Sequence, residues 1–158
     1  MEGKLRLCVE LEPEQIDSFL HDYHAAGEDC YVLYRLKEGQ SSVFKDRIRI
    51  DHGTEYLAYV VGEKVVGVAR ITKNPNPANG VLGYCIRPDE RGKGYAKAIV
   101  KEAINFARVN KIENFTAVVH TKNSKSMHIL VEAGFKPTGI VYDWIPEPEK
   151  RKAIEFAL

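Results

Sequence analysis

The sequence lacks the features that mark several classes of protein. No apolar run approaches the length of a membrane-spanning helix, and the first residues do not resemble a signal peptide. The cysteines are Cys8, Cys30 and Cys85, an odd number without metal-ligand spacing. The formal net charge is +1, which gives no reason to expect nucleic-acid binding. We therefore expect a reduced cytoplasmic protein with no metal site, membrane segment or nucleic-acid partner.

The chain also has no internal repeat, low-complexity tract or linker-like stretch, which excludes repeat arrays and predicts one domain over residues 1–158. Its length is sufficient to bury a substantial core. Apolar residues make up 44% and charged residues 28%, as is usual for globular proteins. Composition therefore predicts a globular domain, and the function has to come from local motifs.

What the sequence does have is a glycine-rich junction, RGKGYA over Arg91–Ala96. An apolar strand precedes it and is stopped by Pro88, and an amphipathic helix follows it. A helix start offers unpaired N–H groups and partial positive charge, and glycines let phosphates approach the backbone. Arg91 and Lys93 add formal positive charge. The junction is predicted to hold a phosphate or a pyrophosphate.

Two familiar phosphate loops do not fit this junction. A dinucleotide-binding G-x-G-x-x-G has its third glycine where this chain has Lys97. A P-loop needs a glycine and a hydroxyl residue where the chain has Arg87 and Gly94. A nucleotide-binding domain that uses the loop differently stays as an alternative.

The pattern that remains is R/Q-x-x-G-x-G/A, met by Arg91, Gly94 and Ala96. It resembles the acetyl-CoA-binding motif of the GCN5-related N-acetyltransferase (GNAT) family. A second stretch, Asn123–Phe135, resembles the family's later motif, N-x-x-S/A followed by a helix that ends in G-F. Helix capping would explain the second stretch alone, but not both motifs in the family's order and separation. The resemblance covers about residues 54–145.

The resemblance implies an α/β fold, a single domain with a central six- or seven-stranded mixed sheet flanked by helices. In the family, the strand before the glycine loop and the strand after the motif helix splay apart, and pantetheine lies in the gap. The hydropathy pattern predicts strands over 4–10, 55–61, 64–72, 81–87, 115–120, 137–145 and 153–158, and helices over 13–27, about 92–109 and about 124–133. Residues 30–50 are ambiguous, with helix plus irregular chain expected.

By the same resemblance, acetyl-CoA is the co-substrate and the acetyl group passes directly to a primary amine. Backbone N–H groups of the glycine loop would bind the pyrophosphate, and the backbone of the preceding strand would pair with pantetheine and polarise the thioester carbonyl. The implied cofactor-binding residues are Tyr84, Cys85, Ile86, Arg91, Gly92, Lys93, Gly94, Tyr95, Ala96 and Asn123.

The catalytic residues depart from the commoner family pattern. The tyrosine acid seven residues after the motif asparagine is replaced by Leu130, and the glutamate base five residues before it is replaced by Val118. The N-x-x-S form resembles the branch of ribosomal-protein N-terminal and diamine acetyltransferases, in part of which the serine is proposed as the acid. Ser126 is therefore the candidate proton donor, although it could instead bond local helix backbone.

Three side chains are candidates for the general base: His120, Asp143 and Glu55. Water relayed to solvent is the alternative. Cys85 is interpreted as a small residue of a packed strand, because no histidine is placed beside it in the sequence.

The acceptor is indicated by charge alone. No lysine or arginine occurs between Leu7 and Tyr34, and the family's acceptor site is walled by helices of this region. An acidic wall of Asp22, Glu28 and Asp29 would favour a cationic amine, such as a polyamine, an aminoglycoside or a peptide N-terminus. Ordinary solvated carboxylates are the alternative. The expected partners are thus a small-molecule amine or a peptide N-terminus, and a homodimer is allowed. The rival function is a non-catalytic acyl-CoA-binding or regulatory module with the same fold.

Overall fold

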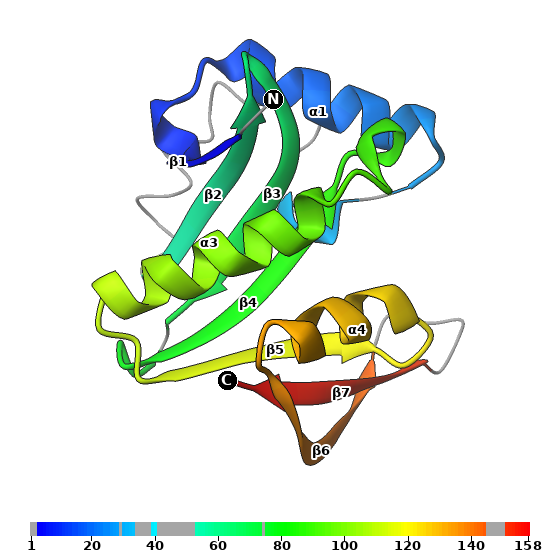
Figure 1. Cartoon of the computed structure of the whole chain (residues 1–158). Helices are drawn as coiled ribbons and strands as arrows, with labels where there is room; N and C mark the ends of the chain where they lie inside the picture. The colour runs from blue at the N-terminus through cyan, green and yellow to red at the C-terminus, as the bar shows by residue number, and fades with distance from the viewer. Residues whose placement is uncertain (1–2, 29, 34–38, 41–52, 74, 145–150) are drawn as a thin grey trace.

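The structure is a computed structural model that describes residues 3–28, 30–33, 39–40, 53–73, 75–144 and 151–158. Its centre is a seven-stranded mixed sheet in the order β1-β2-β3-β4-β5-β7-β6 (Figure 1). The β4–β5 pair is parallel, and the other pairs are antiparallel. The mixed sheet that was predicted is confirmed. The strands are β1 (Lys4–Leu7), β2 (Thr54–Val61), β3 (Lys64–Thr72), β4 (Asn79–Ile86), β5 (Asn114–His120), β6 (Lys136–Trp144) and β7 (Arg151–Ala157).

Helices cover both faces of this sheet. The described helices are α1 (Pro13–Ala25), α3 (Tyr95–Val109) and α4 (Ser124–Glu132), with short 3-10 turns η1 (Cys8–Glu10), η2 (Tyr31–Leu33) and η4 (Pro88–Glu90). In Figure 1, α3 crosses in front of β2 to β4, and α4 lies in front of β5 and β7. The apolar side chains of α1 form a separate core with the other face of β2 to β4. We call these two sides of the sheet the α3 face and the α1 face.

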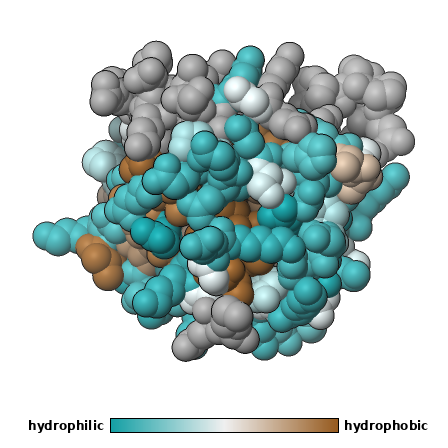
Figure 2. Space-filling model, turned by 90° about the horizontal axis from the view of Figure 1, so that it is seen from above, coloured by the Kyte–Doolittle hydropathy of each residue, from teal (hydrophilic) through white to brown (hydrophobic). Residues whose placement is uncertain are grey.

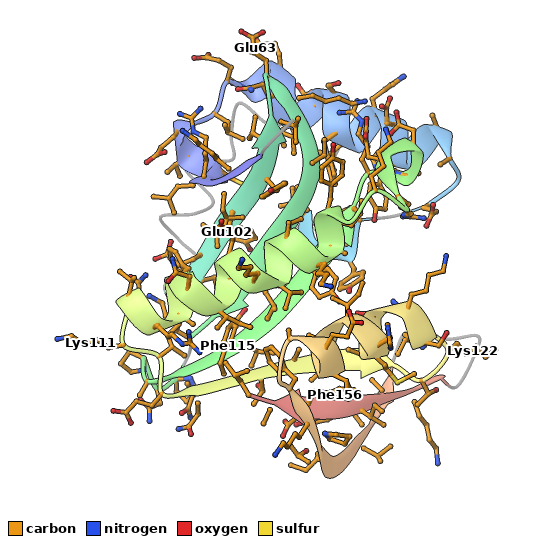
Figure 3. All side chains as sticks on the ribbon, in the orientation of Figure 1. Glu63, Glu102, Lys111, Phe115, Lys122 and Phe156 are labelled. Atoms are coloured by element: carbon orange, nitrogen blue, oxygen red, sulfur yellow. The ribbon has the colours of Figure 1, made fainter. Side chains whose placement is uncertain are left out.

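The apolar periodicity of the sequence explains the two cores. Ile16, Phe19, Leu20 and Tyr23 recur at helical spacing in α1 and are all buried on the α1 face. On the α3 face, apolar residues of α3 and α4 cover Phe115 of β5 and Phe156 of β7, which Figure 3 labels beneath these helices. Burying a large apolar side chain stabilises a fold by about 1.5–3 kcal/mol. Seen from above, hydrophobic atoms show mainly near the centre of the molecule, between hydrophilic side chains (Figure 2).

Some predicted boundaries were wrong. The first strand ends at Leu7, because Cys8–Glu10 turns as a 3-10 helix. The helix after the glycine loop begins at Tyr95 rather than near residue 92. The cause is the positive φ of the loop glycines, which a right-handed helix does not accommodate. Of the ambiguous stretch 30–50, residues 34–38 and 41–50 lie outside the described residues, as do residues 145–150 between the last two strands. No helix in the described part combines the length and apolar content needed to cross a membrane.

Candidate functional site

Two glycines shape the loop between β4 and α3. The φ angles of Gly92 and Gly94 are +79° and +84°, which side-chain-bearing residues rarely adopt. A Cβ built on either glycine would meet no heavy atom within 4 Å, so open space lies beside both. Gly94 is also the N-cap of α3, and no side-chain hydrogen bond caps this helix start in the described chain. The start of α3 therefore presents backbone donors and the positive end of the helix dipole to that space.

The loop is held by Arg91, whose guanidinium turns back toward α1. Its Nη1 donates to both carboxylate oxygens of Glu28 at 2.9 and 3.1 Å, and its Nη2 donates to the Tyr23 hydroxyl at 3.1 Å. Its Nε donates to the Ile86 carbonyl at 3.2 Å, and its Cζ lies 5.5 Å from the centre of the Tyr23 ring. Arg91 therefore connects the loop to the end of α1, and Glu28 offsets much of its charge.

A second group of charges flanks the loop. Lys64 and Lys93 donate to the two oxygens of the Glu90 carboxylate at 2.6 and 2.7 Å. The hydrogen bond from Lys64 and then that from Lys93 hold the pKa of Glu90 at about 2. Lys64 also lies 3.4 Å from the exposed carboxylate of Asp89, so two lysines and two carboxylates balance each other beside the loop.

Arg87 directly follows β4 and anchors that end of the strand. It is 4% exposed, donates from Nε to Asp22 of α1 at 2.6 Å, and also forms an ion pair with that carboxylate through Nη2. Its other donors reach the carbonyl and hydroxyl oxygens of Ser18 and the carbonyl of Val65. A buried guanidinium needs such partners, so this cluster rigidly joins α1, β3 and β4.

β4 and β5 diverge next to this loop. Their pairing runs from Asn79–Asn114 to Leu82–Ala117, and no further pair is recorded between these two described strands. Beyond that point, β4 remains paired with β3 on its other side, and β5 with β7. Figure 1 shows the resulting wedge, which opens toward the start of α3. The predicted splaying of these two strands is confirmed, and the facing edges can bond an extended ligand.

One side-chain contact bridges the wedge on the α3 face. The Tyr84 hydroxyl on β4 lies within hydrogen-bonding distance of the Ser126 hydroxyl on α4, and either oxygen can donate. Ser126 is buried, and its N–H donates to Asn123 Oδ1 at 3.1 Å, so Asn123 caps α4. Burial raises the pKa of Tyr84, so its phenol keeps its proton at neutral pH. The sequence placed the Tyr84 backbone at the site, but not this hydroxyl.

The two positions that depart from the family pattern, Leu130 and Val118, place apolar side chains in the structure. Leu130 is fully buried in the core of the α3 face, and Val118 is half-buried on β5. Cys85 is 6% exposed and belongs to the core of the α1 face, as predicted for a small residue in a packed strand. A hydrogen bond from Cys30 lowers the pKa of Cys85.

The three candidate bases do not come together. His120 is the half-buried last residue of β5, in register with Ala153. The backbone of Asp143 on β6 pairs with Lys152 of β7, so β7 and β5 both lie between it and the wedge. Glu55 of β2 pairs with Ile71 on the α3 face and lies 3.6 Å from Lys73, and its role as a base stays a prediction.

The acidic wall is largely neutralised. Asp22 is bound to Arg87 and Glu28 to Arg91, while Asp29 lies outside the described residues. Opposite charges this close cancel most of each other's field at a distance. The preference for a cationic acceptor stays a prediction, and it receives no support from Asp22 and Glu28.

Comparison with known proteins decides the family. The model of the family described as "Acetyltransferase (GNAT) domain" matches residues 11–136, which is most of the chain. The chain belongs to the GNAT family. It is accordingly an acetyltransferase, which favours the enzyme over the non-catalytic module. No curated protein is similar enough to match this GNAT chain.

Solved GNAT structures share the fold at low sequence identity. A chimera of the spermidine N-acetyltransferase SpeG from Vibrio cholerae and hSSAT has a TM-score of 0.78 at 17% identity, covering 100% of this chain and 95% of that one. A GNAT acetyltransferase from Streptococcus pneumoniae has a TM-score of 0.74 at 18% identity, covering 99% and 98%. The Vibrio cholerae spermidine N-acetyltransferase in complex with CoA and spermine has 0.75 at 17%, covering 99% and 94%.

Proposed function

We propose that this protein transfers an acetyl group from acetyl-CoA directly to a primary amine. The observation that carries the proposal is the wedge between β4 and β5, which opens beside an uncapped helix start with two left-handed glycines. The open space beside Gly92 and Gly94 fits a pyrophosphate on the backbone N–H groups, and the stretches of β4 and β5 that no longer pair with each other fit an extended pantetheine arm. A similar solved structure is a complex with CoA and spermine, and that likeness adds support.

The residues would divide the work between the two faces. The N–H groups of Gly92 to Ala96 would bind the pyrophosphate, with Lys93 supplying charge, and Tyr84 to Ile86 would align the thioester through their backbone. The amine would approach from the α1 face, attack the acetyl carbonyl carbon, and displace CoA as a thiolate. The Tyr84–Ser126 pair on the α3 face would donate a proton to that sulfur.

The acceptor class is proposed from similarity and stays open to test. Spermidine and spermine are named for the similar Vibrio cholerae enzymes, so polyamines head the list of acceptors for this chain, followed by peptide N-termini. The same enzyme has been described as a dodecamer. For this protein, self-association and a cytoplasmic location remain predictions from the sequence.

Thiol release tests the proposal. The protein is mixed with acetyl-CoA and a panel of polyamines, aminoglycosides, peptides and neutral amines, and free CoA is followed with a thiol reagent. We expect amine-dependent release for at least one acceptor, and competition of CoA but not of ATP for the loop. Tight CoA binding without release for any amine would support the non-catalytic module instead.

A further inference from the structure

A carboxylate lies level with the point where β4 and β5 part, on β7, the strand on the other side of β5. Glu155 of β7 is directly opposite Val118 of β5 in the antiparallel ladder. Val118 is the first β5 residue beyond Ala117, where pairing with β4 ends. Directly paired side chains share a face and have Cβ atoms roughly 4.5–5.5 Å apart. The Glu155 side chain is therefore one strand away from the point at which the wedge opens.

The alternation of β7 places this carboxylate on the α1 face. Ile154 and Phe156, on either side of Glu155, pack into the core of the α3 face. Successive side chains of a strand point to opposite faces, so Glu155 lies on the side from which the amine would approach. The Tyr84–Ser126 pair lies on the other face. Two proton-handling groups would thus flank the wedge from opposite sides.

Tyr142 holds the carboxylate in place. Its hydroxyl donates to Glu155 Oε2 at 2.9 Å from the neighbouring strand β6. That hydrogen bond raises the pKa of Tyr142, so the phenol stays protonated and continues to donate. The contact engages Oε2 and leaves Oε1 unused by Tyr142. Glu155 is half-buried, which restricts its rotamers while keeping it accessible from solvent.

We infer that Glu155 is the general base that takes a proton from the acceptor ammonium. This inference rests on the proposed function. An N–H bond of the ammonium breaks as an O–H bond to Glu155 forms, which gives a neutral amine with a free lone pair. The amine attacks the acetyl carbon, the C–S bond breaks, and the thiolate takes its proton from the Tyr84–Ser126 pair. The nitrogen loses a second proton as the amide forms. That proton restores the donor pair, and the proton on Glu155 passes to solvent.

Other titratable or charged groups share this face and define the rivals. They are His120 of β5, Lys136 and Tyr142 of β6 and, across the wedge, Arg70 of β3 and Tyr31 of η2. Among these, His120 is the rival base. It lies two residues beyond Val118 toward the end of β5, whereas Glu155 is level with the opening itself.

The test compares Glu155→Gln with wild type, His120→Gln and Glu113→Gln. The glutamine keeps the shape of Glu155 and the oxygen that accepts from Tyr142, but it accepts no proton. Glu113 is an exposed carboxylate before the far end of β5 and serves as the control. At pH 7, we expect Glu155→Gln to lower kcat/KM for an alkyl amine roughly 100- to 10,000-fold, with an unchanged Kd for CoA. Glu113→Gln should match wild type.

The pH profile separates a base from a structural residue. Without a base, the variant must use amine that is already neutral. Its kcat/KM should therefore rise about tenfold per pH unit toward the amine pKa near 10, and approach wild type there. A loss that is equal at every pH, or a pH-dependent loss in His120→Gln and not in Glu155→Gln, would overturn the assignment. If Glu155→Gln does not fold, Glu155→Asp replaces it. An activity of this shortened variant below one-hundredth of wild type, with the pH dependence of wild type, would also overturn the assignment. Wild type that binds CoA but acetylates no amine would refute the proposed function instead.

Discussion

The hydroxyl groups of Tyr84 on β4 and Ser126 on α4 form a hydrogen bond that bridges the wedge. In the proposed mechanism this contact is the proton donor, which the apolar side chain of Leu130 cannot be. The raised pKa of Tyr84 keeps the pair protonated at neutral pH, and a thiolate that leaves on this side would find a donor. In the proposed mechanism, Tyr84 on the strand and Ser126 would take the role of the helix tyrosine that Leu130 replaces.

Ser126→Ala and Tyr84→Phe should each lower turnover while leaving CoA affinity nearly unchanged, because both remove part of the donor and neither removes the loop. Acid–base groups contribute roughly 100- to 10,000-fold to the rate of a reaction, and the losses from removing two members of one unit do not multiply. The double variant should thus resemble the more damaged single variant in single-turnover kinetics. Independent losses that multiply would show that the two hydroxyls act separately.

Gly94→Asp should weaken CoA binding severely. The substitution puts a carboxylate where a phosphate is expected, at a residue whose φ is +84°. Two like charges about 4 Å apart repel by about 1–4 kcal/mol near a protein surface. Gly139→Asp is the matched control, because its φ of +88° imposes similar strain in β6, away from the loop. Calorimetry that gives both folded variants wild-type affinity would remove the loop from the site.

Asp22→Asn should destabilise the fold because Arg87 is buried and Asp22 is its main carboxylate partner. A buried charge that loses its partner costs about 1–3 kcal/mol when other hydrogen bonds remain. Asp89→Asn is the control: Asp89 is 57% exposed and lies 3.5 Å from Arg87 Nε, so less than about 1 kcal/mol is expected. Urea unfolding of the two variants measures the difference, and equal losses would refute the anchoring role.

Glu90 should make stability depend on pH in the acid range. Its pKa is about 2 in the folded protein against an ordinary value of 4.5, so its contribution is complete above about pH 4.5 and is lost as pH falls toward 2. The free energy of unfolding of wild type should therefore fall more steeply over this window than that of Glu90→Gln. Parallel curves for the two proteins would mean that Lys64 and Lys93 do not stabilise the ionised carboxylate.

Sequence reasoning reached the fold because its strongest signals are local. The spacing of Ile16, Phe19, Leu20 and Tyr23 predicts α1, and the glycine loop predicts both the turn and the helix that follows. The predicted start of α3 was wrong because the positive φ angles of Gly92 and Gly94 delay the helix until Tyr95. Local patterns carry dihedral preferences and apolar faces, and these largely determine individual elements.

Contacts between distant segments could not be predicted in this way. Residues 28 and 91 carry opposite charges, but only the folded chain shows that Glu28 and Arg91 are bound to each other. The register that sets Glu155 opposite Val118 depends on β7 inserting between β5 and β6. Alternation along β4 could have placed the Tyr84 side chain on the face of α4, but the reach of its hydroxyl to Ser126 depends on the packing of that helix.

The most direct test of the account is the fate of the acetyl group. The protein is incubated with acetyl-CoA that carries an isotopic label in the acetyl group, together with a polyamine, and the products are analysed by mass spectrometry. We expect the labelled acetyl group on an amine nitrogen of the acceptor, in an amount equal to the CoA released. Release of CoA with the label recovered as free acetate, for every amine tested, would contradict the central claim.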